Sequence, residues 1–345
     1  MAVASVGGGG ATPNFVQQIA GNLHPFLFVG CWNLVGEPRD AVISAMLTTA
    51  EEKGIKNIVL GGDNVYPLPE DDKILKNIKK AKEKGEKWMG EKPPKHRVKT
   101  FTDGIASFAG FRLIMALGNH NVENAPVRTA EEELLPFNHS YYVAEFEDAA
   151  IVVFDANILK GDEEFHGMKE WLSSVLSYLK GKGKAYYFVT HEPFGSFKKG
   201  KKTIWGISKD SMGNEATIEA GSTPAILSTL QTHLPLAVLC ADTHHYEEGV
   251  ISGGDSGAIR QIIVGSGGAS FNDYTHPATP FSIGGPFLYS MTSEPVSKYG
   301  FLLLEDAAST AFIPAWNWSG GKRKTRRGYT RRTHKKLTRR AHRRS

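Results

Sequence analysis

The chain has 345 residues, of which 41% are hydrophobic, and this composition excludes a mostly disordered protein. Its longest apolar runs are only a few residues long, whereas a membrane-spanning helix needs about 20, so we expect no contact with a membrane. The two cysteines, Cys31 and Cys240, are too few for a disulfide framework, and the glycine-rich start lacks the apolar segment of a signal peptide. We therefore expect an intracellular protein of the cytoplasm or nucleus.

The net charge of +5 combines two opposed regions. Thirteen of the 41 Lys and Arg residues lie between positions 320 and 345, where there is no Asp or Glu. The other 28 face 36 acidic residues, so the rest of the chain has a net charge of −8. The sequence thus predicts an acidic folded domain over residues 23–318 and a basic, disordered tail over residues 319–345.

In chain order, residues 1–22 are expected to form a flexible leader, because Gly7 to Gly10 has no side chains to pack. The apolar run 26–29 predicts a buried strand, residues 37–53 have helical spacing that stops at Gly54, and residues 56–60 predict another strand. This order predicts a parallel sheet. Residues 70–99 are rich in Lys and Glu, and we expect them to form a charged surface insertion with a solvated helix in its first half.

The later segments alternate in the same way. We predict helices over residues 101–111, 163–180 and 225–233. We predict strands over residues 112–117, 141–146, 150–154, 184–189, 236–239, 246–251, 258–264, 300–304 and 311–314. This mixture indicates an α/β protein in which two sheets pack face to face with helices outside.

Five short segments contain groups that bind metals or handle phosphates, and each follows an apolar, strand-like run. They are Gly30-Cys31-Trp32-Asn33, Gly62-Asp63-Asn64-Val65-Tyr66, Gly118-Asn119-His120-Asn121, Thr190-His191-Glu192-Pro193 and Ala241-Asp242-Thr243-His244. Because functional groups in α/β folds gather at the carboxyl ends of strands, these segments predict a single site. Their chemistry predicts a phosphoesterase with two metal ions.

The residue types suit that reaction. Two metal ions about 4 Å apart can activate a hydroxide, and a shared carboxylate holds them close; Asp63, which follows two glycines, is the best candidate. Asn119 offers an amide oxygen to a metal, and His120 can donate a proton to the leaving oxygen. His191 offers an imidazole suited to zinc, iron or manganese. Taken alone, Asp63 fits a turn and His191 fits a structural role, but the set favours ligands.

The order Gly-Asp-Asn-x-Tyr, Gly-Asn-His, x-His-x-Pro and a late His-containing turn resembles the calcineurin-like metallophosphoesterase superfamily. Within it, the chain is most similar to the small, single-domain purple acid phosphatases of the tartrate-resistant type. The resemblance covers roughly residues 24–315, includes Trp32 and Trp171, and is poor over residues 70–99. It implies a four-layer α-β-β-α sandwich of two mixed sheets flanked by helices.

The resemblance also implies a ligand set and two divalent or trivalent metal ions, namely Fe, Zn or Mn. The first metal would be bound by Cys31, Asp63, Tyr66 and His244. The second would be bound by Asp63, Asn119, His191 and Asp242. His120 would be the catalytic residue, and a phosphate ester would be the substrate. Asn33, Asn64 and His245 are accessory candidates, because they neighbour these residues in the sequence.

Three positions depart from the family pattern. The family has Asp where this chain has Cys31, and a thiolate shifts the preference towards zinc or ferrous iron; a small buried residue without a metal bond is the alternative. The family has His at position 242, where this chain has Asp242. Asn121 replaces an acidic residue that would support His120. These departures leave a rival hypothesis open, namely a catalytically degenerate protein that acts as a binding module.

The tail supports a second rival, a nucleic-acid-associated protein. Its candidate contacts are Lys322, Arg323, Lys324, Arg326, Arg327, Arg331 and Arg332. Such a run can neutralise phosphates without reading sequence, can serve as a nuclear import signal, or can simply solubilise the chain. Its composition also resembles tails on proteins of large DNA viruses, which would place the protein in a virion. We expect the chain to be a monomer.

Overall fold

The computed structural model describes residues 12–66, 80–81, 83–85, 95–122, 125–156, 162–198, 207–209, 215–217, 222–254, 257–274 and 280–315. The predicted basic tail and most of the predicted charged insertion therefore lie outside the described residues, as does the start of the predicted leader.

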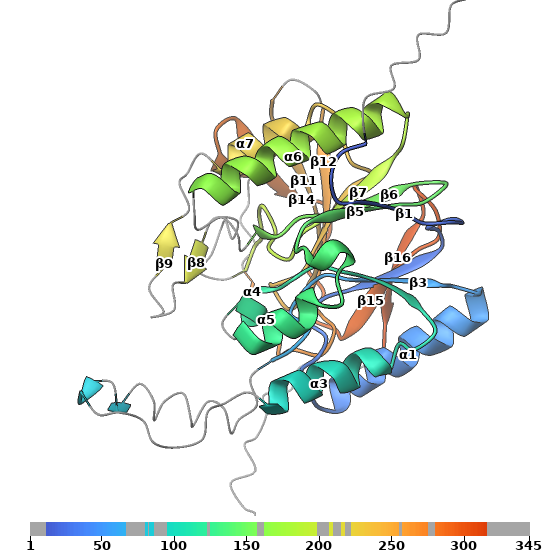
Figure 1. Ribbon diagram of the computed structural model, residues 1–345, viewed down its shortest axis with the longest axis vertical. Coiled ribbons are helices and arrows are strands. Elements are labelled where there is room, and N and C mark those ends of the chain that lie inside the picture. Colours follow the sequence, from blue (N-terminus) through green and yellow to red (C-terminus); the bar gives the residue numbers. More distant parts are fainter. Residues whose placement is uncertain are drawn as a thin grey trace, which may run out of the picture.

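The described residues form four layers, in which two sheets face each other and helices cover the outer faces (Figure 1). Helices α6 (Asp162–Gly181) and α7 (Ser222–Leu230) cover the larger sheet, while α1 (Glu37–Lys53) and α3 (Lys95–Ala106) cover the smaller one. The expected α-β-β-α sandwich is confirmed. None of the helices in the described part of the chain is both long and apolar enough to cross a bilayer.

The smaller sheet has five strands, and its centre is parallel. Their order is β16 (Thr310–Pro314), β15 (Gly300–Leu304), β2 (Phe26–Val29), β3 (Asn57–Leu60) and β4 (Arg112–Met115). Strands β2, β3 and β4 run parallel, and β15 joins β2 antiparallel. The three parallel strands therefore end at the same edge, where three of the five motifs begin.

The larger sheet has nine strands. Their order is β1 (Val16–Gln18), β5 (Tyr142–Glu145), β6 (Ala150–Val153), β7 (Tyr186–Val189), β10 (Ala237–Cys240), β12 (Ile259–Val264), β11 (Tyr246–Ser252), β14 (Phe287–Met291) and β13 (Phe281–Gly284). Strands β7 and β10, which precede the other two motifs, are parallel neighbours. Short elements complete the fold: α4 (Asn119–Val122), α5 (Ala125–Glu132), the 3-10 turn Pro136–Asn138, and the pair β8 (Ile207–Lys209) and β9 (Glu215–Thr217).

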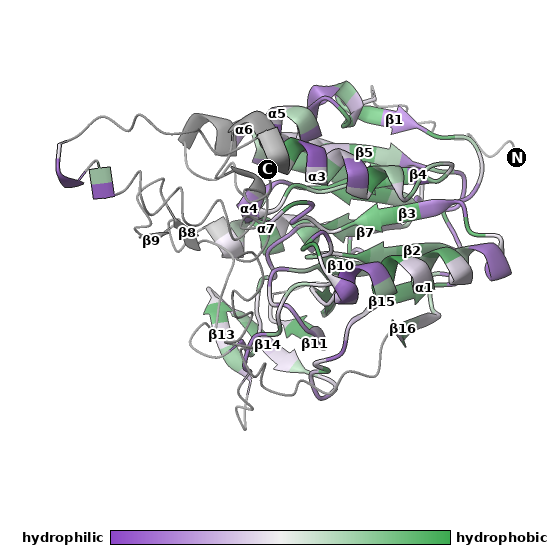
Figure 2. Cartoon of the chain, turned by 90° about the horizontal axis from the view of Figure 1, so that it is seen from below, coloured by the Kyte–Doolittle hydropathy of each residue, from purple (hydrophilic) through white to green (hydrophobic). Residues whose placement is uncertain are grey.

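The central strands are buried on both faces, which explains why they read as continuous apolar runs. In β7, Tyr187 and Val189 point into the core between the sheets, whereas Tyr186 and Phe188 pack under α6 and α7. Parallel strands covered on both faces have this composition. Figure 2 shows β2, β3 and β7 as largely hydrophobic and α1 and α3 as mixed. Two cores therefore hold the strand ends in place.

Part of the predicted leader is wrong, because Val16–Gln18 forms strand β1 and not a flexible segment. It pairs in parallel with β5, and the Gln18 amide donates a hydrogen bond of 2.5 Å to Glu145. The edge of β5 would otherwise expose unpaired backbone groups. The sequence Val-Gln-Gln has no apolar pattern, so only the neighbouring edge makes it a strand.

Candidate metal centre

The loops after β2, β3, β4, β7 and β10 meet at one edge of the sandwich. The Gly30 amide donates to Val264 O of the facing sheet at 2.9 Å, and the Cys31 amide donates to Gly62 O at 3.0 Å. A side chain at Gly62, which has a φ of 92°, would come within 2.5 Å of the His191 ring. Only glycine allows this approach. The five predicted motifs are therefore neighbours in space.

Asp63 lies at the centre of this edge, is 1% exposed and has a left-handed φ of 52°. One carboxylate oxygen, Oδ2, accepts a hydrogen bond from the Tyr66 hydroxyl at 3.0 Å and lies 3.9 Å from Cys31 Sγ. The other, Oδ1, lies 3.3 Å from His191 Nε2. The two oxygens thus face two different groups of side chains, as a carboxylate shared between two cations would.

The group on the Oδ2 side contains Cys31, Tyr66 and His244. His244 Nε2 lies 3.3 Å from the Tyr66 hydroxyl, and its Nδ1 donates to Ser270 O at 2.7 Å. Because that carbonyl can only accept, it holds the proton on Nδ1 and turns Nε2 towards Tyr66. Burial raises the pKa values of the Cys31 thiol and the Tyr66 hydroxyl well above their ordinary values, and the adjacent Asp63 charge raises them further.

The group on the Oδ1 side contains His191 and Asp242, and Asn119 directly precedes His120, whose backbone amide donates to Oδ1. His191 Nδ1 donates to Gly61 O at 2.8 Å, which leaves Nε2 facing Asp63 and, at 4.0 Å, Asp242 Oδ1. The amide oxygen of Asn119 is buried and has no hydrogen-bond partner among the residues that the structure describes. A buried acceptor without a donor costs free energy, about 1–3 kcal/mol, unless a cation or a water satisfies it.

These donors fit a metal ion. Ligand atoms of Cys31, Asp63 and His191 all lie within 4.8 Å of one another, and all three side chains are buried. Asn119, which directly precedes His120, offers a further oxygen donor of the hard type. The carbonyl contact at His191 Nδ1 is the kind of outer contact that orients a ligating histidine.

Asp63 and His191 form a buried ion pair in the metal-free protein. Burial opposes the charged form of His191, but the Asp63 carboxylate outweighs burial and raises the pKa of His191 to about 9. Burial likewise opposes ionisation of Asp63, but His191 and then His120 outweigh it, and the pKa of Asp63 falls below its ordinary value. The proton on His191 Nε2 therefore stands where the resemblance implies a bond from this nitrogen to a metal.

His120 lies beside the Asp63 carboxylate, and its side chain is accessible from outside. Its backbone amide donates to Asp63 Oδ1 at 3.1 Å, its ring Nε2 lies 4.0 Å from Asp63 Oδ2, and its side chain is 29% exposed. Its ring centroid lies 4.9 Å from that of Tyr66. A substrate at the carboxylate would therefore be within reach of this imidazole.

The three accessory candidates make other contacts. Asn33 donates to the backbone oxygens of Asn64 and Thr100, at 2.8 and 3.2 Å. The Asn64 side chain accepts from Trp32 Nε1 at 2.9 Å and donates to Ala116 O at 3.0 Å. His245 lies behind the site and contacts Glu247 at 2.7 Å. These contacts hold loops together, so we leave all three residues out of the ligand set.

Sequence reasoning missed Lys198. Its ammonium lies 3.7 Å from Asp242 Oδ2, with 20% of the side chain exposed. Lys198 belongs to no motif, and three further lysines, Lys199, Lys201 and Lys202, follow it closely in the sequence. Those three lie outside the described residues, and the sequence alone does not single out Lys198 among them. The predicted tail contacts lie outside the described residues.

Gly118 offers a direct test of the site's packing. A Cβ added there would come within 2.1 Å of the Asp63 amide nitrogen and 2.3 Å of Asp63 Oδ1. We expect Gly118→Ala to displace Asp63 and to destabilise the fold by about 1–3 kcal/mol, as measured by urea denaturation.

The matched control is Gly167→Ala in α6. Gly167 is exposed, and an added Cβ would meet nothing within 4 Å. Alanine there should stabilise the helix by about 0.5–1 kcal/mol. Equal unfolding midpoints for both variants would show that Gly118 does not limit the approach to Asp63.

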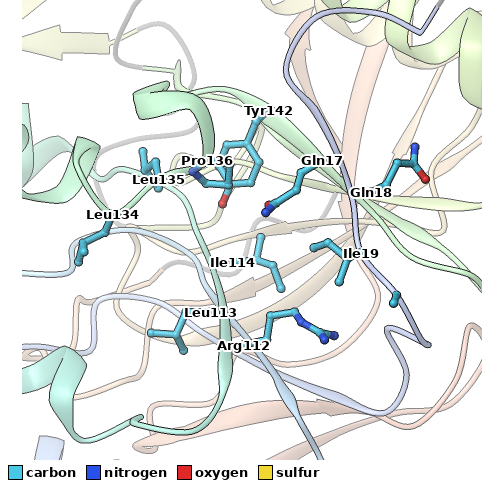
Figure 3. A pocket seen from close by; sticks show the side chains of 11 residues that line it. Gln17, Gln18, Ile19, Arg112, Leu113, Ile114, Leu134, Leu135, Pro136 and Tyr142 are labelled. Carbon is cyan, nitrogen blue, oxygen red and sulfur yellow. The ribbon is translucent and has the colours of Figure 1, made fainter.

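A cavity of about 450 Å³ lies apart from this site. Arg112 and Leu113 at the start of β4, Gln17 and Ile19 around β1, and Leu134 line it (Figure 3). Asn119 and His120, in contrast, follow the end of β4. The residues that line this cavity do not include a group of metal-ligating side chains, so the strand-end site is the better candidate for a metal centre.

No family model matches the sequence, and no curated protein matches it significantly. Solved structures do match the fold. A purple acid phosphatase from yellow lupin (Lupinus luteus) seeds aligns with a TM-score of 0.57 at 13% identity, over 86% of this chain and 52% of that enzyme. This chain thus spans about half the length of the lupin enzyme.

Two further structures align with lower scores. One is described as GAP50, the anchor in the inner membrane complex of Plasmodium, with a TM-score of 0.47 and 14% identity over 84% of this chain and 88% of that one. The other is a dimetal phosphatase from Danio rerio, with a TM-score of 0.44 and 10% identity over 85% of this chain and 99% of that one. The fold assignment rests on the lupin structure.

Proposed function

We propose that this chain, which has the fold of the calcineurin-like metallophosphoesterases, hydrolyses a phosphate ester at a centre of two metal ions that share Asp63. One observation carries the proposal. The two oxygens of the Asp63 carboxylate face separate donor groups, with Tyr66 at 3.0 Å on one side and His191 at 3.3 Å on the other. A carboxylate with a purely structural role would not need its two oxygens to face separate groups of metal-binding side chains.

The proposed ligands follow from these two groups. Cys31, Tyr66 and His244 would hold one ion, and Asn119, His191 and Asp242 the other. When bound, the ions would supply an activated hydroxide and would stabilise charge on the phosphoryl group. Cys31 in place of a carboxylate favours zinc or ferrous iron at the first position over harder ions.

The chain's own residues handle protons and orientation. His120 reaches the carboxylate from an accessible position and would donate a proton to the leaving oxygen. Gly61 O and Ser270 O keep the protons of His191 and His244 on Nδ1, so that each Nε2 faces the centre.

The test is hydrolysis of an aryl phosphate by the purified protein, together with its metal content. We expect two equivalents of metal per chain, and we expect His120→Asn to lower kcat by on the order of 10²–10⁴-fold without loss of metal. His233→Asn is the control, because His233 contacts Lys184 O at the far ends of the strands. We expect it to keep the wild-type kcat.

Two outcomes would contradict the proposal. A folded protein without metal and without turnover at any pH would favour the degenerate binding module, for which the departures at Cys31 and Asp242 are the specific evidence. Nucleic-acid affinity that is lost with the tail, in a chain without turnover, would favour the nucleic-acid-associated protein.

A further inference from the structure

We propose that Lys198 is an anion-binding residue of this site, whose ammonium contacts Asp242 and the phosphoryl oxygens of the substrate together. The inference rests on the proposed function, because it assigns a residue to the same site. It adds a cation that none of the motifs contains.

The first argument is the geometry of the ion pair. Lys198 Nζ lies 3.7 Å from Asp242 Oδ2, whereas Asp242 Oδ1 faces His191 Nε2 at 4.0 Å. A separation of 3.7 Å is too long for a hydrogen bond, so Asp242 attracts the ammonium without using one of its three donors. The same carboxylate therefore links the metal side of the site to a cation that can still bind an anion.

The second argument is the way in which the backbone of Lys198 is held. Its amide donates to Ser196 Oγ at 3.2 Å, and Ser196 Oγ donates to Glu247 Oε2 at 3.3 Å. Glu247 is fully buried and also accepts from the Phe197 amide at 3.4 Å and from Tyr289 at 2.7 Å. A buried carboxylate with several donors keeps its position, so the loop that carries Lys198 is anchored.

Two more contacts fix the same loop from either side. Gln261 accepts from the Phe194 amide at 2.8 Å and donates to Gly195 O at 2.7 Å. Lys198 itself forms an antiparallel bridge with Tyr274. Hydrogen bonds before Lys198 and the bridge at Lys198 itself thus fix the backbone from which its side chain reaches the site.

The third argument is charge. Asp242, which lies 4.0 Å from His191 Nε2, brings a negatively charged carboxylate to the place where a phosphate must bind. Lys198 supplies the opposite charge next to it. An anion at Asp63 would therefore meet a cation that offsets Asp242.

The experiment measures binding of inorganic phosphate to the purified, metal-containing protein by calorimetry. We compare wild type with Lys198→Met, Lys198→Arg and the control Lys182→Met, which removes another lysine–carboxylate pair, 2.7 Å from Glu145, on a different part of the fold. We expect Lys198→Met to weaken phosphate binding by about 10- to 100-fold, the usual effect of one charged hydrogen bond.

The other variants separate anion binding from a structural role. Lys198→Arg and Lys182→Met should bind phosphate within about threefold of wild type, because arginine keeps the charge and Lys182 lies elsewhere. All variants should keep the wild-type metal content. For an aryl phosphate, Lys198→Met should raise KM more than it lowers kcat.

Two results would overturn the inference. One is unchanged phosphate affinity in Lys198→Met, and the other is equal loss of metal in Lys198→Met and Lys198→Arg, which would make the residue a support for Asp242. Failure of the proposed function looks different. A wild-type protein that binds phosphate through Lys198 but has no turnover would refute hydrolysis and keep the anion site.

Discussion

Asp63→Asn should remove the bound metal and lower the turnover of an aryl phosphate by on the order of 10³-fold or more. The substitution keeps the shape of the side chain and one oxygen, but it removes the negative charge that both donor groups surround. The amide also places an NH₂ group against either His191 Nε2 or Tyr66, which now lie 3.3 and 3.0 Å from the carboxylate oxygens. One end of the side chain then repels a cation.

The matched control is Asp148→Asn. Asp148 accepts hydrogen bonds from the Leu23 amide at 2.6 Å and from His24 at 2.7 Å, in the turn between β5 and β6. It is a hydrogen-bonded carboxylate with no part in the site, so its loss should affect stability and leave metal content unchanged. Metal analysis and single-turnover assays are made at a temperature at which circular dichroism shows both variants folded. Two equivalents of metal in Asp63→Asn would end the case for a shared carboxylate.

Metal affinity should rise steeply with pH, because the metal must displace a proton from His191. In the metal-free protein the pKa of His191 is raised to about 9, since Asp63 outweighs the effect of burial. Below that pH, each unit of acidity should weaken binding by up to about tenfold. Between pH 6 and pH 9, three units apart, the part of the loss that is due to the His191 proton is on the order of 10³-fold. Competition with a chromophoric chelator measures it.

The Asp63–His191 ion pair also affects the stability of the metal-free fold, but in the opposite direction: its stabilising contribution decreases at alkaline pH, whereas metal affinity increases. His191 has a raised pKa, so its contribution to stability is complete below its unfolded value of about 6.5 and is lost as the pH rises through about 9. Asp63 has a lowered pKa, so its contribution is complete above about 4 and is lost in stronger acid. At alkaline pH, where metal binds best, this pair should therefore contribute little to the stability of the metal-free protein.

His191→Asn tests how much of the pH dependence of metal affinity comes from the proton on His191. The variant lacks the imidazolium, so the slope of log affinity against pH should fall by about one relative to wild type. The Cys31 thiol, whose pKa burial raises, still releases its proton when it binds metal. Cys31→Ser is the reciprocal variant and should keep the part of the slope that belongs to His191. Identical slopes for wild type and His191→Asn would exclude His191 from the ligand set.

Local sequence was sufficient where side chains alone decide the structure. The run Phe-Leu-Phe-Val makes β2 a buried strand on both faces, and α1 ends at Gly54, which has a φ of 64°. Other elements were displaced or absent from the prediction. Helix α3 begins at Lys95 and not at residue 101, and the strands β13 and β14 were not predicted. In β14 the sequence hides the alternation, because Phe287, Leu288 and Tyr289 are all apolar although Leu288 is exposed.

For the candidate site as well, some features were predictable from the sequence and others were not. That Asp63, Asn119, His120, His191 and His244 meet was predictable, because each follows an apolar run and parallel strands end at one edge. The direction of each side chain was not. Asn33 and Asn64 lie in the motifs and are candidate ligands from the sequence, but their side-chain amides bind backbone groups and Trp32.

By itself, the sequence determined that a two-sheet α/β sandwich forms and that five strand ends supply metal-binding chemistry, because apolar runs and the glycines after them act over a few residues. Tertiary structure alone decided that β1 becomes a strand, that the Asp63 oxygens face different groups, and that Lys198 reaches Asp242. Those features depend on contacts between segments far apart in the chain. Their free energy comes from packing and buried hydrogen bonds that no local pattern encodes.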